Sequence, residues 1–552
     1  MRHKILSVDN AAIVSVFIVG ELVFGFSSLW IGQDVNFDQR NYHFYTAYAL
    51  VHHRLQYDVL PAQIQTFLNP VLNLPFYCLV QTLSPKGTGF VLGAIHGLNF
   101  FLAFLFSLSL LKKLAVLNKL ALSLLLAATG IYAPASLTLL GTTNGDNITS
   151  LFVLGGLLVL VRKSEGPLRW RDFYLSGLFL GLAAGLKYVN MIYVIALFAT
   201  VFLMVVFQQA LIPALVSLSL GVVTGIASAA GLWMWRMWEK FDNPLFPFFN
   251  KIFHSPYSPL SNWDNLYSQW KPKDVFEACL YPFYWLSPQT ISFPLPLRDA
   301  RWAVLVVLAL TALLTHGVQA IKERNYNDRG WRTQAVMPER GGRVIVLFLL
   351  LSFPLWLVMF SYHRYVFPLE VLTGVAIFWL IDRFSLHQTA KLVLGGSLCA
   401  LVIVSVKAPG RGHLKWGNEW FGVTTPPLAA PTETVVLMIG RKPTSYVIPF
   451  FPSEVRFIRL VSTFNTENTR FAEEIGDLIK QHNGPFLVLL KGEASPEDRG
   501  ALARHNLAIV PEKCIAIASR IDHDLQLCQA LRGPRLNTAA TETDTTANHA
   551  AR

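Results

Sequence analysis

Two carboxylates and a run of hydrogen-bonding side chains lie together near the start of the chain. Asp34 and Asp38 stand four residues apart in the stretch from 33 to 55 (QDVNFDQRNYHFYTAYALVHHRL), and Tyr42 and His43 follow them. A carboxylate at such a place acts as a general base, binds a metal ion or caps a helix. Two acids followed closely by Asn, Tyr and His favour a chemical role over capping alone.

Helical spacing divides this stretch into two arcs if a helix begins near Asp38, at 100° per residue. One arc is apolar or aromatic, and the other is polar and carries the carboxylate. This division predicts an amphipathic helix on a membrane surface, with its polar arc turned toward another part of the protein. The first arc comprises Phe37, Phe44, Tyr48, Val51 and Leu55, and the second comprises Asp38, Asn41, Tyr42, Tyr45 and His52.

Two later positions carry charges that suit an acceptor or a phosphate. Asp146 lies in the turn GTTNGDN (141–147), which is either a tight hairpin turn or an acidic site. Lys187 lies between two apolar segments. A lysine at such a place extends to the membrane interface or neutralises a phosphate.

The segment SYHRYVFPLE (361–370) holds a third group of candidates. Arg364 offers a planar fork that matches phosphate oxygens, although an interfacial anchor is the alternative. Glu370 falls inside the following apolar segment, where a carboxylate is costly without a partner. His363 or Arg364 is the expected partner.

Composition excludes a soluble protein. The 552 residues are 53% hydrophobic and only 14% charged, whereas soluble domains average about 25% charged residues. The net charge of +12 does not indicate nucleic acid, because Lys and Arg cluster in short loops between apolar segments, as in cytoplasmic loops of membrane proteins. Five cysteines form no CxxC or metal-binding spacing.

The apolar segments predict an α-helical polytopic protein with about eleven transmembrane helices. The basic N-terminus and the loop charges place the N-terminus in the cytoplasm and the Asp34 loop on the outer face. Residues 67–83 are apolar but broken by Asn-Pro, so this segment is either re-entrant or a poor span, and the charge pattern favours eleven crossings without it. The expected spans lie near 10–31, 88–111, 120–140, 147–161, 173–187, 190–207, 211–237, 302–320, 344–361, 365–382 and 391–407.

The character of the chain changes after residue 410. We expect a membrane domain at 1–410 with a first outer loop at 32–66, an exported α/β domain at 411–532, and a disordered tail at 533–552. Strands are expected at 434–440, 456–461, 485–490 and 514–519, and amphipathic helices at 468–482 and 496–505. Cys514 and Cys528 stand symmetrically in a hairpin, where they form a disulfide or remain buried thiols.

These features together resemble the GT-C superfamily of membrane glycosyltransferases, which includes protein mannosyltransferases and aminoarabinose transferases. The resemblance rests on a first span, the acids Asp34 and Asp38, an amphipathic segment at 38–55 and a Pro-containing apolar segment, and covers roughly residues 1–407. The family often has an Asp-Glu pair where this chain has Asp38-Gln39. The difference removes one metal ligand and leaves Asp38 as the base, with Asp34 as a substitute.

The resemblance implies an inverting glycosyltransferase in a bacterial-type inner membrane. It implies that a sugar passes from a polyprenyl-phosphate donor to a hydroxyl of a glycan, lipid or protein acceptor on the extracytoplasmic face. Arg364 and Lys187 would contact the phosphate, and Asp34 and Asp146 would contact the acceptor or a metal. A divalent metal held by Asp38 and Asp146 stays open as the one cofactor. The remaining substrate-binding candidates are Tyr42, His43, His363 and Glu370.

Three other functions remain open on the same residues. A transporter or flippase of lipid-linked saccharides uses similar cations, but such proteins often contain internal repeats, and we find none. A glycan polymerase or ligase handles lipid-linked sugars without an acid directly after the first span. A scaffold whose exported domain binds a partner would need the loop acids only as helix caps.

Overall fold

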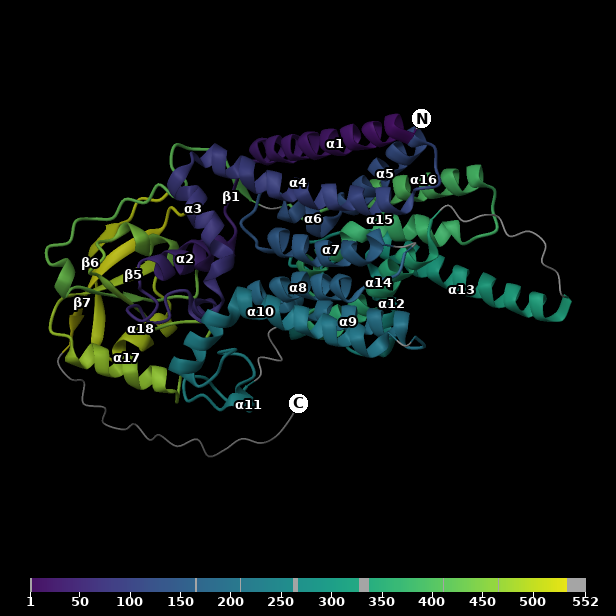
Figure 1. Cartoon of the computed structure of the whole chain (residues 1–552). Helices are drawn as coiled ribbons and strands as arrows, with labels where there is room; N and C mark the ends of the chain where they lie inside the picture. Colours follow the sequence, from purple (N-terminus) through teal and green to yellow (C-terminus); the bar gives the residue numbers. More distant parts are fainter. Residues whose placement is uncertain are drawn as a thin grey trace, which may run out of the picture. The chain divides into compact units, whose positions relative to one another are not determined.

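The computed structural model describes residues 2–163, 166–208, 210–261, 267–326, 337–410, 412–464 and 466–533 (Figure 1). Two compact units divide the chain. Unit 1 comprises Met1–Tyr48 and Phe67–Trp420, and unit 2 comprises Ala49–Thr66 and Phe421–Arg552.

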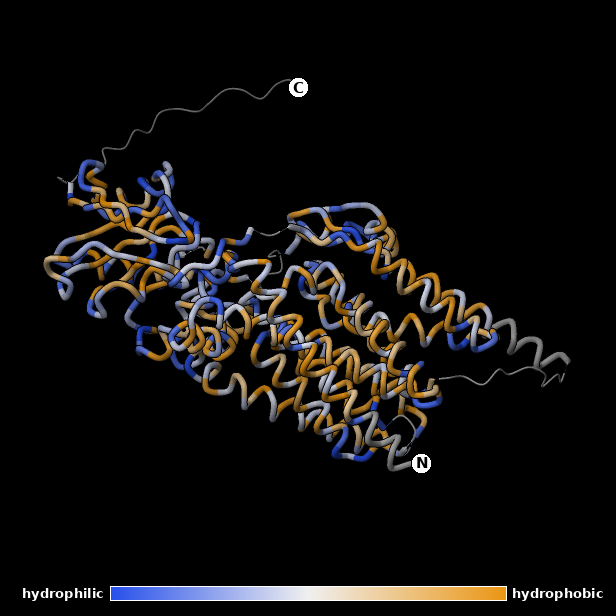
Figure 2. Tube along the Cα trace, turned by 90° about the horizontal axis from the view of Figure 1, so that it is seen from above, coloured by the Kyte–Doolittle hydropathy of each residue, from blue (hydrophilic) through white to orange (hydrophobic). Residues whose placement is uncertain are grey.

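Unit 1 is a bundle of helices, and each of the eleven expected spans overlaps one of them. Seven are long and apolar enough to cross a membrane by length and composition, in the described part of the chain. Figure 2 accordingly colours these helices mainly as hydrophobic. The eleven helices are α1 (Arg2–Ile31), α4 (Pro85–Leu110), α5 (Val116–Ile131), α7 (Asp146–Arg162), α8 (Trp170–Leu186), α9 (Met191–Val205), α10 (Leu211–Phe241), α13 (Arg301–Tyr326), α14 (Glu339–Met359), α15 (Phe367–Asp382) and α16 (Gln388–Ser405). The span expected at 120–140 ends early, because α5 stops at Ile131 and the separate short helix α6 (Pro134–Leu139) follows.

The apolar segment at 67–83 does not form one long helix. It breaks into the 3₁₀ turn η3 (Pro70–Asn73) and the helix α3 (Leu74–Thr82). Nine helical residues rise about 14 Å, less than half of the roughly 30 Å hydrocarbon core. Asn69 begins η3 because its Oδ1 accepts a hydrogen bond from the backbone N–H of Val71 (3.1 Å).

Two features hold the helices of unit 1 in place. All 16 residues of α15 are buried, so this helix forms the centre of the bundle. Helices α8 and α10 approach closely through glycines: a Cβ atom at Gly177 or Gly221 would lie 2.3 Å or less from a backbone oxygen of the other helix. Such small-residue contacts are typical of membrane helices.

The helix expected at 38–55 is shorter than predicted and is not amphipathic. A π-helical turn, η1 (Gln39–His43), precedes α2 (Phe44–Val51). Phe44 and Tyr45, assigned to opposite arcs, are each only 1% exposed. The prediction was wrong because α3 covers this helix: the ring centroid of Phe44 lies 5.4 Å from that of Tyr77.

Unit 2 contains a five-stranded sheet in the order β4-β3-β5-β7-β6, with the first three strands parallel and β7 antiparallel to both neighbours. The predicted α/β domain is therefore present, although β6 begins seven residues before the strand expected at 514–519. The elements are β3 (Val435–Met438), β4 (Arg456–Arg459), β5 (Phe486–Lys491), β6 (Leu507–Ala516), β7 (Leu525–Arg532), α17 (Arg470–Gln481) and α18 (Pro496–Ala503).

The boundaries between the units differ from the expected ones. Residues 49–66 belong to unit 2, because the backbone of Val59 bridges to Ile458 and Arg54 donates to the carbonyl of Ser453 (2.6 Å). Residues 412–420 belong to unit 1 instead, because β2 (His413–Leu414) pairs with β1 (Gln33–Asp34).

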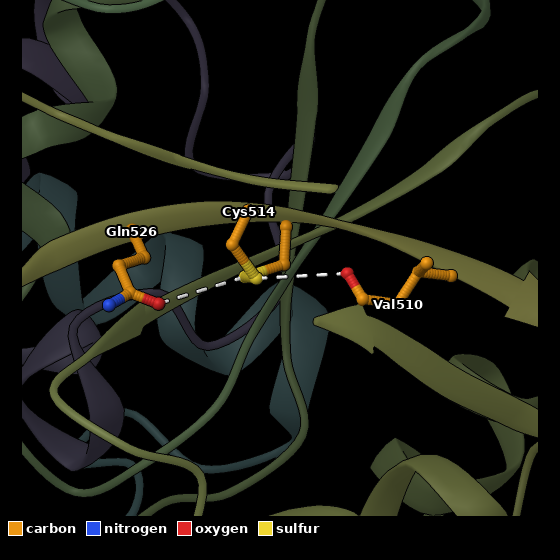
Figure 3. The surroundings of a disulfide bond; sticks show 4 residues. Val510, Cys514 and Gln526 are labelled. Carbon is orange, nitrogen blue, oxygen red and sulfur yellow. Dashed lines mark hydrogen bonds between the residues drawn. A yellow bond between two sulfur atoms is a disulfide. The ribbon is translucent and has the colours of Figure 1, made fainter. Parts of the chain in front are cut away.

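Cys514 and Cys528 lie opposite each other in the β6–β7 ladder, as the hairpin predicted, and a disulfide joins them (Figure 3). The bond lies within unit 2 and ties the two antiparallel strands together. The tail expected at 533–552 falls almost entirely outside the described residues.

Candidate functional site

Four of the predicted residues form one continuous chain of charges in unit 1. Arg364 Nη1 donates to Asp38 Oδ2 at 2.9 Å, and Arg364 Nε lies 3.1 Å from Asp146 Oδ2. Lys187 Nζ donates to Asp146 Oδ1 at 2.6 Å. The order is therefore Asp38, Arg364, Asp146, Lys187, and residues from four distant parts of the sequence converge.

Helix ends and turns position these four side chains. Asp38 precedes the π-turn η1, and Asp146 is the first residue of α7, where a carboxylate is favoured by the helix dipole. Lys187 stands at the extended break that ends α8. Arg364 lies in η6 (His363–Val366), the 3₁₀ turn that leads into α15. Breaks in membrane helices are typical where they line a polar region.

The cluster is mostly buried but not closed. The side chain of Asp38 is 20% exposed and that of Lys187 is 16% exposed. Two carboxylates and two cations leave the cluster neutral. Burial would raise the pKa of Asp38, but the charge and hydrogen bond of Arg364, together with the other nearby cationic groups, hold that pKa below its usual value. Asp38 is therefore ionised at neutral pH.

One contact in the cluster leaves hydrogen-bonding capacity unused. Arg364 Nε and Asp146 Oδ2 are close enough for an ion pair, yet each is a buried atom without a hydrogen bond among the described residues. A buried donor without an aligned acceptor is unfavourable.

Aromatic side chains and one amide complete the surroundings, and sequence reasoning missed them. Asn144 Oδ1 accepts from Arg364 Nη1 (2.8 Å). The Arg364 guanidinium lies over the rings of Tyr362 (5.6 Å) and Tyr365 (5.5 Å), and Lys187 lies 5.2 Å from the centroid of Tyr365. The two tyrosines flank His363-Arg364 in the sequence, and this position was the signal that could have identified them as part of the site.

The other predicted acid, Asp34, has a different task. It is 1% exposed, and its carboxylate accepts from the backbone N–H groups of Asn36 (3.1 Å) and Thr143 (3.3 Å). His43 Nδ1 contacts the hydroxyl of the same threonine (2.8 Å). Asp34 thus ties the first loop to the 141–147 turn and, unlike Asp38, is not exposed.

His43 and its neighbour Tyr42 stack edge to face, with ring centroids 4.3 Å apart. Burial lowers the pKa of His43 to about 4, although the charge of Asp38 opposes this shift. The imidazole is therefore neutral near pH 7. His43 is available as a hydrogen-bonding group beside Asp38 and not as a cation.

His363 and Glu370 pair with each other and not with the charged chain. His363 Nε2 lies 3.0 Å from Glu370 Oε1, and Glu370 is fully buried. The sequence had named His363 as one of two candidate partners for this carboxylate. This pair lies beside the cluster because His363 directly precedes Arg364.

The residues do not fit the metal site that the sequence left open. Arg364 occupies the position between Asp38 and Asp146 where a shared cation would lie. No group of three or more His, Cys, Asp or Glu side chains suited to a metal is found in the described ranges. A guanidinium takes the place of the metal between these two acids.

Comparison with known proteins finds structural similarity only. No family model and no curated protein matches the chain. A crystal structure of ArnT from Cupriavidus metallidurans bound to undecaprenyl phosphate is 13% identical, with 94% of this chain and 97% of that chain covered and a TM-score of 0.38. The same protein in the apo state is also 13% identical, with 95% and 99% covered and a TM-score of 0.40. ArnT is an aminoarabinose transferase.

Proposed function

We propose that this protein is a membrane glycosyltransferase that moves a sugar from a polyprenyl-phosphate donor to an acceptor hydroxyl on the extracytoplasmic face. The observation that carries the proposal is the chain of Asp38, Arg364, Asp146 and Lys187. Asp38, which is ionised and partly exposed, contacts Arg364, and Asp146 links Arg364 to the second cation, Lys187. A transfer from a lipid phosphate needs a base at the acceptor and positive charge at the leaving group.

The proposed reaction is a single displacement at the anomeric carbon. The acceptor oxygen forms a bond to that carbon, and the bond to the phosphate oxygen breaks with its electron pair remaining on the phosphate. The proton of the acceptor hydroxyl passes to the carboxylate of Asp38. General-base assistance of this kind contributes about 10²–10⁴-fold in rate.

Arg364 and Lys187 stabilise the phosphate as negative charge develops on it. Arg364 Nε makes no hydrogen bond among the described residues, and Lys187 Nζ donates to Asp146 Oδ1 at 2.6 Å. Preorganised cations at a developing charge commonly contribute more to catalysis than the base does. The tyrosines beside them offer faces on which a sugar ring packs.

The test is the release of polyprenyl phosphate from a panel of undecaprenyl-phosphate-linked hexoses and pentoses, with the purified full chain and candidate acceptors. We expect release by the wild type with at least one donor and acceptor, and a loss of about 10²–10⁴-fold in Asp38→Asn. The matched control is Asp274→Asn, because Asp274 is an exposed cap of α12 (Val275–Tyr284) outside the cluster.

Binding of undecaprenyl phosphate alone, the lipid that the ArnT crystal structure holds, separates chemistry from recognition. Asp38→Asn should retain this binding, because Arg364 and Lys187 remain. A transporter would bind the donor without releasing the phosphate at any acceptor concentration. Unchanged release in Asp38→Asn would remove Asp38 from the proposed role.

A further inference from the structure

A second polar chain, fully buried, lies beside the charged cluster. It begins at Glu370, whose carboxylate accepts from the backbone N–H groups of Ala135 (3.2 Å) and Ser136 (3.1 Å) in α6 (Pro134–Leu139). The third group on this carboxylate is His363 Nε2 at 3.0 Å. Three partners hold the Glu370 carboxylate in one orientation within the bundle.

The chain continues from Ser136 through a second histidine. His96, on α4, contacts Ser136 Oγ through Nε2 (3.0 Å) and Asn147 Oδ1 through Nδ1 (2.9 Å). Its ring stacks on Phe367 with centroids 5.4 Å apart, and the histidine is 1% exposed. His96 therefore connects α6 with the start of α7.

Donors and acceptors agree at every link. The amide of Asn147 donates to the carbonyl of Leu139 (2.7 Å), so its oxygen accepts from His96 Nδ1–H. His96 Nε2 must then accept from the hydroxyl of Ser136. The carboxylate of Glu370 requires the N–H of His363 on Nε2, so each histidine has one tautomer. A fully satisfied buried network of this kind specifies one arrangement.

Both ends of this chain adjoin the charged cluster. His363 directly precedes Arg364, and Asn147 directly follows Asp146. Because Arg364 and Asp146 face each other at 3.1 Å, the contacts close into a ring. The backbone adds support at one end, where the N–H of His363 donates to the carbonyl of Ser292 (2.8 Å).

We propose that this buried ring of His363, Glu370, Ser136, His96 and Asn147 positions Arg364 and Asp146 for the phosphate of the donor. The inference rests on the proposed function and deepens it by assigning positioning residues to the same site. These residues act through Arg364 and Asp146 and do not contact substrate. A displacement of reacting groups by about 1 Å, caused by a change far from them, can lower the rate about 10²-fold. Residues that fix the positions of Arg364 and Asp146 therefore contribute to the rate.

The experiment measures binding of undecaprenyl phosphate to the purified full chain, by intrinsic tryptophan fluorescence or native mass spectrometry. Glu370→Gln keeps the shape and one acceptor oxygen but removes the charge that orients His363. We expect about tenfold weaker binding, as for the loss of one charge-assisted hydrogen bond. Ser136→Ala is the milder second variant, since it removes only the link to His96, and should weaken binding about two- to threefold.

The matched control is Asp382→Asn, at the other end of the same helix. Asp382 is equally buried and is held by Lys391 Nζ (3.2 Å), so its loss destabilises α15 without touching the ring. Its affinity for the lipid phosphate should equal that of the wild type. When Arg364 is replaced by alanine, Glu370→Gln should weaken lipid binding no further, because the side chain that Glu370 positions is then absent.

The outcomes separate the two proposals. If the wild type does not bind undecaprenyl phosphate, the proposed function fails. If the wild type binds and Glu370→Gln binds equally well, the positioning role is overturned. Equal weakening by Glu370→Gln and Asp382→Asn, or an additive loss in the Arg364→Ala background, would show a structural role and would also overturn it.

Discussion

Replacement of Arg364 by lysine tests whether the site depends on geometry or on charge alone. Arg364→Lys keeps the positive charge but loses the planar fork. The guanidinium contacts Asp38 and Asn144 through Nη1 and faces Asp146 through Nε. A single ammonium at the end of a flexible stem cannot reproduce these directions together.

The expected loss follows from the number of contacts. Lysine keeps one charged contact and loses about one charge-assisted hydrogen bond, which is worth about 1.5–3 kcal/mol. The side chain of Arg364 is only 10% exposed, so solvent screening reduces this value little. We expect sugar transfer to fall about 10–100-fold, since each 1.4 kcal/mol is tenfold. Folding stability should change less, because the charge balance is retained.

The assay is the release of undecaprenyl phosphate, with thermal unfolding of the same preparation as the control for folding. Because Asp38 and Arg364 contact each other, Arg364→Lys and Asp38→Asn should be less than additive. Transfer by Arg364→Lys within twofold of the wild type would refute the geometric argument. The cation would then act only as a point charge.

Two further predictions concern stability. The pKa of His43 is about 4 in the folded protein and near 6.5 when unfolded, so the unfolded state binds more protons between these values. The free energy of unfolding should therefore fall as pH drops from about 6.5 to 4, by about 3 kcal/mol in total, and His43→Gln should lose this component in thermal unfolding. Cys528→Ser removes the disulfide, which closes a loop with a sequence separation of 14 residues, and should destabilise unit 2 by about 3 kcal/mol. Maleimide in denaturant should label three cysteines in the oxidised wild type, and labelling of all five would contradict the disulfide.

The sequence predicted those parts of the structure that depend on local patterns. Long apolar segments predicted the eleven longest helices of unit 1, and short apolar segments predicted β3, β4, β5 and the end of β6 in unit 2. The segment at 38–55 was mispredicted because its burial depends on α3, which no local pattern reveals. The placement of 49–66 with the sheet depends on a backbone bridge between Val59 and Ile458, nearly 400 residues apart.

The site residues were predictable by type but not by partner. A charged residue beside an apolar membrane segment is costly unless it has a partner or a function, and this argument identified Asp38, Asp146, Lys187 and Arg364. It could not tell that Arg364 lies between the two acids, because pairing across four elements is a property of the bundle. For the same reason Asn144 was missed, since a turn asparagine has an ordinary local explanation.

The pairing of Asp38 with Arg364 also affects how basic the Asp38 carboxylate is before and after the donor binds. Burial raises the pKa of Asp38, but Arg364 and the other nearby cationic groups together lower it further, so the pKa lies below its usual value. A phosphate that binds Arg364 would offset the positive charge that Asp38 experiences, so the effect of burial would increase. The carboxylate would then become more basic when the donor is present, and remain a weak base without it. In the proposed reaction, the same ion pair therefore holds Asp38 in place and links its basicity to the arrival of the donor.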